Sequence, residues 1–186
     1  MGNSVMRMLT GRQKVRVLML GLDNAGKTTI VHHLKGEQEY ESIPTVGFNV
    51  ETIKLKNIAL NVWDVGGQDK IRPLWRHYFV GTDALIFVVD SSDVGRMEDA
   101  KNEFLRIVDD AEIKDASVLV FANKCDLPKA ASAAEVAELL DLGRLAQEGR
   151  AVHVQSACAR SGEGLTQGID WLTEQLLARS KKTKKK

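Results

Sequence analysis

Apolar and β-branched residues gather in short runs along the chain, with polar segments between them. Four runs have the length and composition of strands buried on both faces: residues 15–20, 84–90, 118–123 and 151–155. Two more runs, 48–55 and 58–64, are separated by Lys56 and Asn57 and predict an antiparallel hairpin. The pattern therefore predicts six strands.

Helical periodicity fills the intervals between these runs. Apolar residues recur at spacings of three and four in 97–108 and in 165–176, and the segment from Lys27 onward also predicts a helix. Ser132 and Glu135 have the spacing of a capping box at a helix start. Because strands alternate with helices, we expect an α/β fold with a mostly parallel six-stranded sheet and helices on both faces.

Composition narrows the class of protein. The 186 residues are 44% hydrophobic and 27% charged, which is typical of one globular domain. The longest apolar runs are far shorter than the roughly 20 residues of a membrane-spanning helix, and the N-terminus lacks the apolar core of a secretory signal. Two cysteines fit a reduced compartment. We therefore expect a cytoplasmic protein.

Charge is distributed unevenly. Residues 179–186 hold six basic side chains and residues 1–16 hold four, with no acid in either, whereas the rest has 25 acids against 16 bases. We predict an N-terminal segment 1–13, a globular domain 14–178 and a basic tail 179–186. The basic ends favour binding to an anionic membrane surface, and the acidic charge of the remaining residues disfavours binding to nucleic acid. The alternatives for the tail are a solvated segment without a partner and binding of nucleic acid.

A phosphate-binding loop is predicted where the first strand ends. Residues 21–28 read GLDNAGKT and fit the P-loop pattern between a strand and a helix; a simple glycine-rich turn is the alternative. Backbone N–H groups and the helix N-terminus would bind phosphate, Lys27 would supply a positive charge and Thr28 a hydroxyl ligand for Mg²⁺. The nucleotide-binding residues predicted here are Asp23, Asn24, Ala25, Gly26, Lys27, Thr28 and Thr29.

Three further positions complete a predicted phosphate and metal site. Asp64 ends a strand and would hold Mg²⁺ through a water molecule, although a turn-forming aspartate is the alternative. Gly67 would offer its N–H to the terminal phosphate. Thr45, in a polar stretch, would add a second hydroxyl to the metal when a γ-phosphate is present.

Two segments after later strands predict a guanine site. Asn123, Lys124 and Asp126 follow one strand, and Cys158 and Ala159 follow the last. A carboxylate accepts hydrogen bonds from both N1–H and the exocyclic amine of guanine, a donor pair that adenine lacks. Taken alone, the first segment would be a helix cap or turn. Both lie at carboxyl ends of strands, where open α/β sheets bind ligands.

With these motifs in order, the chain resembles the ADP-ribosylation factor (Arf) and Arf-like family of small GTPases. The matching segments are 21–29, 43–51, 62–79, 123–126 and 164–172. Asp23, the pair Gly67 and Gln68, and the absence of a C-terminal prenylation cysteine separate the chain from the Ras, Rho and Rab branches. Asn24 favours the Arf-like group.

The resemblance implies a switch between GDP and GTP with Mg²⁺ as cofactor. Gln68 would orient the attacking water and Lys27 would stabilise charge on the phosphates, while Thr28 and Thr45 would bind the metal. Hydrolysis would be slow without a GTPase-activating protein, and a guanine-nucleotide exchange factor would reload the protein. Arg72 and Arg76 are alternative sources of positive charge in cis, but surface arginines usually contact partners or solvent.

Three aromatic residues match the family's effector-binding positions: Phe48, Trp63 and Tyr78. Packing in the core is the alternative for them, above all for Trp63. In the family the hairpin slides by two residues on GTP binding, a step that keeps each side chain on its own face of the sheet. Cys125, beside the base site, is either an inert variable position or an oxidation sensor.

Membrane attachment is the last implication. Gly2 is available for myristoylation, although position six is Met where Ser or Thr is preferred. The resemblance implies a monomeric peripheral membrane protein that cycles to the cytosolic face of the Golgi and recruits effectors in vesicle-mediated transport. The rival functions are a P-loop kinase or ATPase, and a nucleotide-locked scaffold without a hydrolytic cycle.

Overall fold

The six predicted strands form a single sheet. The computed structural model describes residues 13–36, 45, 47–54 and 58–183. The spatial order is β2 (Phe48–Lys54), β3 (Ile58–Val65), β1 (Gln13–Leu20), β4 (Ala84–Asp90), β5 (Ser117–Asn123), β6 (Val152–Ser156). Neighbouring strands are parallel except for β2 and β3, which are antiparallel. The mostly parallel sheet and the hairpin are therefore confirmed, while the predicted turn at Lys56 and Asn57 lies outside the described residues.

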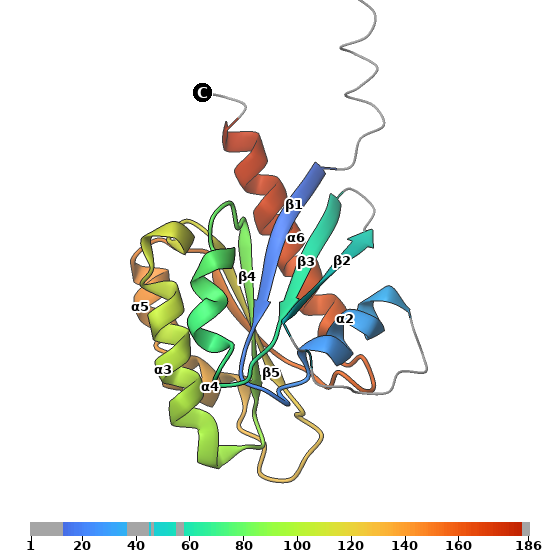
Figure 1. The fold of residues 1–186 in the computed structure, drawn as a ribbon, viewed down its shortest axis with the longest axis vertical. Helices are drawn as coiled ribbons and strands as arrows, with labels where there is room; N and C mark the ends of the chain where they lie inside the picture. Colours follow the sequence, from blue (N-terminus) through green and yellow to red (C-terminus); the bar gives the residue numbers. More distant parts are fainter. Residues whose placement is uncertain (1–12, 37–44, 46, 55–57, 184–186) are drawn as a thin grey trace, which may run out of the picture.

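Helices cover both faces of the sheet, as expected (Figure 1). One face packs against α2 (Lys27–Lys35) and α6 (Leu165–Thr183), and the other against α3 (Met97–Val108), α4 (Ala133–Leu139), α5 (Leu142–Gln147) and the 3-10 helix η1 (Arg72–Tyr78). Successive side chains of β1 point to opposite faces of the sheet and so contribute to both cores. Val17 and Met19 pack on the face covered by α2 and α6, whereas Leu18 and Leu20 pack on the face covered by α3, α4, α5 and η1.

Local signals explain where several helices begin. The Ser132 side chain accepts from the Glu135 backbone and Glu135 reaches back to the Ser132 N–H, which confirms the predicted capping box of α4. The pattern did not predict η1 or α5. Two shorter 3-10 helices, η2 (Val94–Arg96) and η3 (Ala111–Ile113), flank α3.

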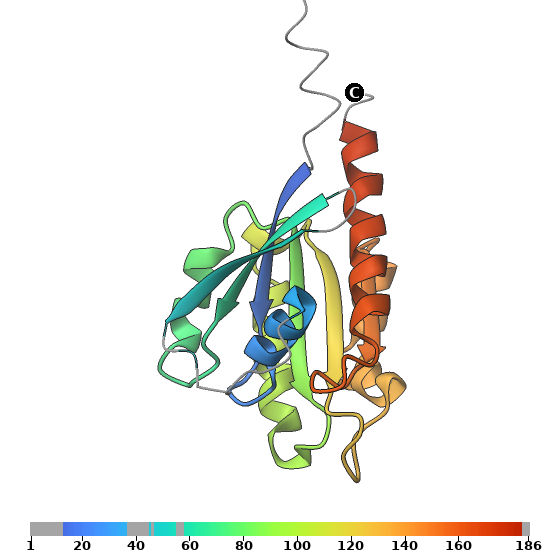
Figure 2. The same ribbon diagram turned by 90° about the vertical axis from the view of Figure 1, so that its right-hand side faces the viewer.

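The start of β1 and the end of α6 lie at the same end of the molecule (Figure 2). Helix α6 continues to Thr183, past the expected domain boundary at residue 178. Arg179 in this last part of the helix donates to the carbonyl oxygen of Asp83, which precedes β4. Among the residues described, no helix combines the length and the apolar character needed to cross a membrane.

Candidate functional site

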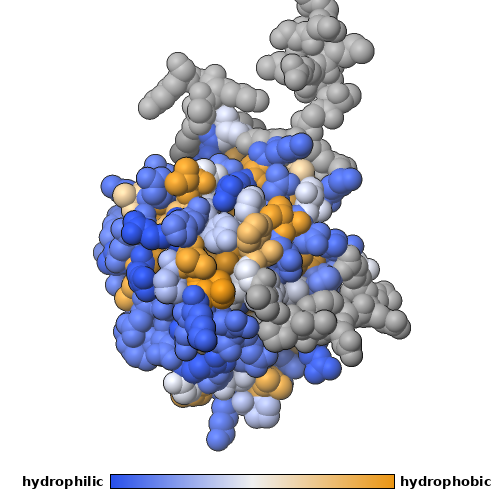
Figure 3. Space-filling view, viewed as in Figure 1, coloured by the Kyte–Doolittle hydropathy of each residue, from blue (hydrophilic) through white to orange (hydrophobic). Residues whose placement is uncertain are grey.

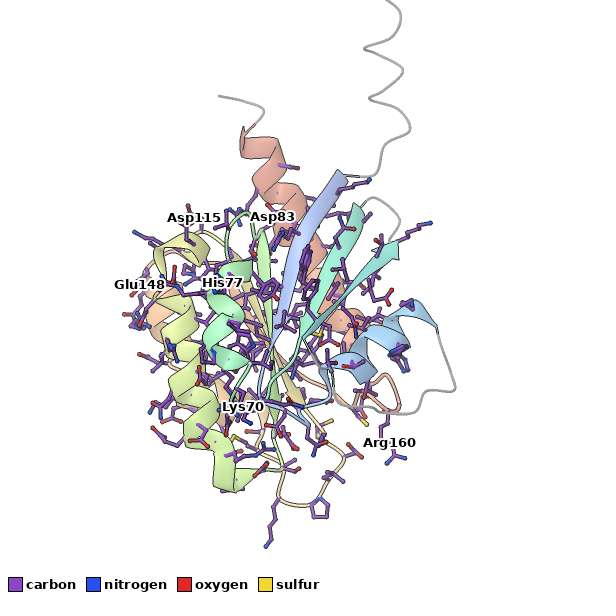
Figure 4. The ribbon with its side chains drawn as sticks, viewed as in Figure 1. Lys70, His77, Asp83, Asp115, Glu148 and Arg160 are labelled. Carbon is purple, nitrogen blue, oxygen red and sulfur yellow. The ribbon has the colours of Figure 1, made fainter. Side chains whose placement is uncertain are left out.

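The predicted motifs meet around one cavity of about 740 Å³ at the carboxyl ends of the parallel strands. Lys70 and Arg160 mark this end of the molecule in Figure 4, whereas Asp83 and Asp115 lie toward the other end. The lining includes Gln68 and every predicted nucleotide-binding residue except Ala25: Asp23, Asn24, Gly26, Lys27, Thr28, Thr29, Thr45, Gly67, Asn123, Lys124, Asp126, Cys158 and Ala159. Ala25 is buried and does not line the cavity.

The phosphate loop is held by its own lysine. Lys27 is 5% exposed, and its Nζ donates to the carbonyl oxygens of Gly21 and Leu22 at 2.9 and 2.8 Å. Burial lowers the pKa of Lys27 to about 8, against the opposing pull of Asp64 and Asp23. Phosphate oxygens in the cavity would favour its charged form. Gly26 has a φ of +98°, and a side chain there would collide with the Asn123 amide, so glycine is required.

Two hydroxyls and one carboxylate gather beside the loop. Thr28 Oγ1 donates to Asp64 Oδ2 at 2.6 Å and lies 2.9 Å from Thr45 Oγ1, which is itself 3.4 Å from Asp64 Oδ2. Asp64 is 1% exposed, and its buried Oδ1 has no hydrogen-bond partner among the residues that the structure describes. Burial raises the pKa of Asp64, and the hydrogen bond from Thr28 opposes that rise. These oxygens fit the ligand preference of Mg²⁺.

The switch segment, residues 66–68, closes the phosphate end of the cavity. The Asp23 N–H donates to the Gly67 carbonyl at 3.1 Å, and a Cβ on Gly67 would collide with the backbone of the phosphate loop. The buried Trp75 donates its indole N–H to the Gly66 carbonyl at 2.9 Å. Only a glycine at position 67 allows the switch segment to approach the phosphate loop this closely.

The opposite end of the cavity is built around Asn123. This side chain is 1% exposed, donates to the Ala25 carbonyl at 2.7 Å and accepts from the Ala159 N–H at 2.9 Å. It therefore joins the phosphate loop to both predicted base-binding segments. Lys124 has a φ of +62° and pairs with Asp90 at 2.7 Å, which orients the segment that ends in Asp126.

Cys125 fits an inert position better than an oxidation sensor. Its N–H donates to the Ala157 carbonyl, so its backbone helps to join the two base-binding segments. Burial, followed by the charge of Glu163, raises the pKa of the Cys125 thiol. A thiol that keeps its proton is a poor nucleophile toward oxidants.

The three predicted effector residues form one cluster, which lies apart from the cavity lining. Phe48 stacks on Trp63 with ring centroids 5.3 Å apart, and Tyr78 lies 5.3 and 5.9 Å from these two rings. Phe48 is 45% exposed, so the alternative of simple core packing does not hold for it. Hydrophobic residues gather on this face of the molecule (Figure 3). The large exposed ones on β2 and around η1 are Phe48, Val50, Leu74 and Val80.

Sequence reasoning missed several residues of the site. Gly66, Leu127 and Arg160 also line the cavity, and each is next to a predicted residue, so extending the motifs by one position would have found them. Arg96 was missed for another reason. Its guanidinium lies 3.0 Å from Asp23 Oδ1 across 73 residues of sequence, and no local pattern predicts that contact. Gly2 lies outside the described residues.

Comparisons with known proteins agree with this geometry. The model of the ADP-ribosylation factor family matches residues 2–176. A solved structure of the Arl6 BBS3 small GTPase from Trypanosoma brucei, with the nucleotide analogue GppNp bound, is 37% identical with a TM-score of 0.80. The match covers 89% of this chain and 99% of that one. The predicted fold is confirmed.

Proposed function

The chain belongs to the ADP-ribosylation factor family of small GTPases, and from this premise we propose that it recruits partner proteins to an internal membrane of Golgi type in its GTP-bound state. As a family member it binds GTP and GDP and hydrolyses GTP. The observation that carries the proposal is the closure of Thr45 and the switch segment over the phosphate end of the cavity. Contacts of this kind are where a γ-phosphate would be distinguished from its absence.

Each residue of the site has a chemical role in this proposal. Lys27 binds the phosphates and stabilises the charge that develops on them, and Gln68 orients the water that attacks the γ-phosphate. Thr28 and Thr45 would bind Mg²⁺ directly, with Asp64 acting through water. The ion, when bound, would neutralise charge on the phosphates. Asp126 would accept from the guanine base.

Unaided hydrolysis is expected to be slow. Arg72 and Arg96, which lie beside the phosphate loop, already pair with carboxylates, among them Asp23. Arg76 is on the surface, with 72% of its side chain exposed, and pairs with Asp110. A GTPase-activating protein would supply the missing positive charge, a contribution that reaches about 10³ to 10⁵ in rate. An exchange factor and GTP-dependent effectors complete the set of proposed partners.

The proposed membrane attachment rests on the two ends of the chain. Gly2 would carry a myristoyl group, and one acyl chain needs a second contribution for stable binding. The sequence after Ser180 holds five lysines, and α6 carries this tail to the end of the molecule where β1 begins. Both proposed membrane contacts thus start from the end opposite the nucleotide cavity.

Tryptophan fluorescence tests the switch. The full-length protein is loaded with GDP, treated with EDTA and a GTP analogue, and returned to excess Mg²⁺; an ATP analogue serves as the control. We expect a large fluorescence change with the GTP analogue and none with the ATP analogue, because the Trp75 indole is hydrogen-bonded to the Gly66 carbonyl of the switch segment. Tight GDP binding without a change would favour the locked scaffold. A preference for adenine nucleotides would favour the kinase or ATPase.

Vesicle binding tests the membrane contribution of the tail. A variant with Lys181, Lys182, Lys184, Lys185 and Lys186 replaced by Gln is compared with wild type on vesicles of neutral lipid with and without phosphatidylserine. At about 1 kcal/mol per basic residue near an anionic surface, we expect at least tenfold weaker binding to the anionic vesicles only. Equal binding of both proteins would contradict a role of the tail.

A further inference from the structure

Arg72, on the 3-10 helix η1, makes polar contacts with three other parts of the molecule near the site. Its side chain is only 12% exposed, although that of Arg76, four residues later on η1, is 72% exposed. Its Nε donates to the Gly67 carbonyl at 2.9 Å. Its two terminal nitrogens face carboxylates of Asp69, Asp23 and Glu103 at 2.7, 3.6 and 4.0 Å. One guanidinium thus connects the switch segment, the phosphate loop and α3.

The bond to Gly67 matters because this residue has no side chain. Gly66 and Gly67 can be held only through their backbone groups, and η1 supplies a donor to each carbonyl: Trp75 to Gly66 and Arg72 to Gly67. The Gly67 carbonyl also accepts from the Asp23 N–H. Arg72 therefore reinforces the place where the switch segment crosses the phosphate loop, and its attraction to Asp23 pulls the same two segments together.

We propose that Arg72 is a positioning residue that holds residues 66–68 against the phosphate loop and thereby makes the protein bind GTP more tightly relative to GDP. The inference rests on the proposed function. A segment that is already held in place loses less conformational freedom when the γ-phosphate binds. GDP has no γ-phosphate for this segment to contact, so holding the segment in place does not increase the affinity for GDP.

The same contacts exclude Arg72 as a source of positive charge for the reaction. Three carboxylates and a carbonyl surround its guanidinium, and releasing it would leave Glu103, with 19% of its side chain exposed, paired to Arg106 alone within this cluster. Releasing the guanidinium would also break its hydrogen bond to the Gly67 carbonyl, whereas the pairs with the exposed Asp69 and Asp23 add little to this cost. Arg72 acts through the backbone of Gly67 and not on the phosphates.

The test measures dissociation of fluorescent GDP and of a fluorescent, non-hydrolysable GTP analogue from full-length Arg72→Ala, Arg72→Lys and, as the matched control, Arg76→Ala. We expect the GTP analogue to dissociate from Arg72→Ala about tenfold faster than from wild type, and GDP to dissociate at a rate within twofold of wild type. The variant lacks the charged hydrogen bond to Gly67, and only the GTP analogue has a γ-phosphate that contacts the segment this bond holds. Arg72→Lys keeps the charge without the fork of donors and should be intermediate. Arg76→Ala should match wild type.

Thermal unfolding of the GDP-loaded proteins separates positioning from a general structural role. An unchanged midpoint in Arg72→Ala supports the proposal, and equal acceleration of both nucleotides together with a lower midpoint overturns it. If Arg72→Ala fails to fold, the proposal is tested with Arg72→Lys, by the ratio of the dissociation rate of the GTP analogue to that of GDP. Failure of the proposed function would be seen separately, as a wild-type protein that does not bind guanine nucleotides.

Discussion

The two ends of the nucleotide cavity are built differently, although they belong to one sheet. At the base end every residue of β5 is buried, and Asn123 joins three segments through buried hydrogen bonds. At the phosphate end, the strand that carries Asp64, β3, pairs with the edge strand β2, in which only Ile53 is buried. There the contacts run between hydroxyls, glycine carbonyls and ion pairs on separate segments.

This difference indicates which part of the site can respond to the nucleotide. Buried strands and fully satisfied amides resist rearrangement, since moving them exposes apolar surface and leaves polar groups unpaired. Polar contacts among loop segments are worth less individually and can be replaced by contacts to phosphate. The base end is therefore suited to constant recognition and the phosphate end to switching.

Breaking the base end should have the largest effect. Asn123→Ala removes two buried hydrogen bonds and leaves the Ala25 carbonyl and the Ala159 N–H without this partner. At about 1–3 kcal/mol for each of the two unsatisfied groups, we expect at least about 30-fold weaker binding of both GDP and a GTP analogue. Equilibrium titration with fluorescent nucleotides measures it.

The control for this change is Asn102→Ala, an exposed asparagine on α3. It should leave both dissociation constants within twofold of wild type. A loss confined to the GTP analogue in Asn123→Ala would contradict the distinction between the two ends, because the base end would then also be sensitive to the γ-phosphate.

Breaking the phosphate end should separate the two nucleotides. A Cβ at residue 67 would collide with the backbone of Gly21, Leu22 and Asp23, so Gly67→Ala should force the switch segment away from the phosphate loop. We expect the affinity for a GTP analogue to fall about 10- to 100-fold, while GDP affinity stays within a few-fold. Competition titration against fluorescent GDP measures both constants.

Gly143→Ala is the matched control, because an added Cβ there meets no described residue within 4 Å apart from its own helix backbone and chain neighbours. It should bind both nucleotides as wild type does. If Gly67→Ala retained full affinity for the GTP analogue, the close approach of the switch segment would be irrelevant to GTP binding.

Most of the fold was predictable because its signals are local. The run 84–90 predicted β4 and the capping box at Ser132 predicted the start of α4, both of which the structure confirms. The P-loop pattern located the phosphate loop because its chemistry needs glycine, lysine and threonine at set spacings. For the same reason the predicted nucleotide-binding residues other than Ala25 all line the cavity.

Long-range polar contacts were not predictable from local patterns. Arg96 reaches Asp23 and Arg72 reaches Glu103 only because the fold brings η2 to the phosphate loop and η1 to α3. An arginine on a short helix has the same local pattern whether most of its side chain is exposed, as in Arg76, or enclosed by neighbouring segments, as in Arg72. The aromatic cluster was located through the family resemblance, but the exposure of Phe48 required the structure.

The smallest expected effect concerns Asp90 and Lys124, which stiffen the base end. Burial alone would raise the pKa of Asp90, but hydrogen bonds from Lys124 and Ser92 outweigh it and lower this pKa below 3.8. A carboxylate with a lowered pKa in the folded state contributes stability above the unfolded pKa and loses it as the pH falls through the folded one. Asp90→Asn keeps an acceptor for Ser92 and removes the ion pair with Lys124.

We therefore expect Asp90→Asn to lower the free energy of unfolding by about 1–2 kcal/mol at pH 7, a deficit that persists down to the ordinary pKa of an aspartate and then shrinks as the pH falls through the lowered pKa of the folded state. Urea unfolding of the GDP-loaded protein across this range measures it, with Asp115→Asn as the control. Asp115 is exposed and lies toward the end of the molecule away from the cavity (Figure 4), so its replacement should have little effect at any pH. A deficit that stayed constant below pH 3.8 would show that Asp90 stabilises the base end through its shape and hydrogen bonds rather than its charge.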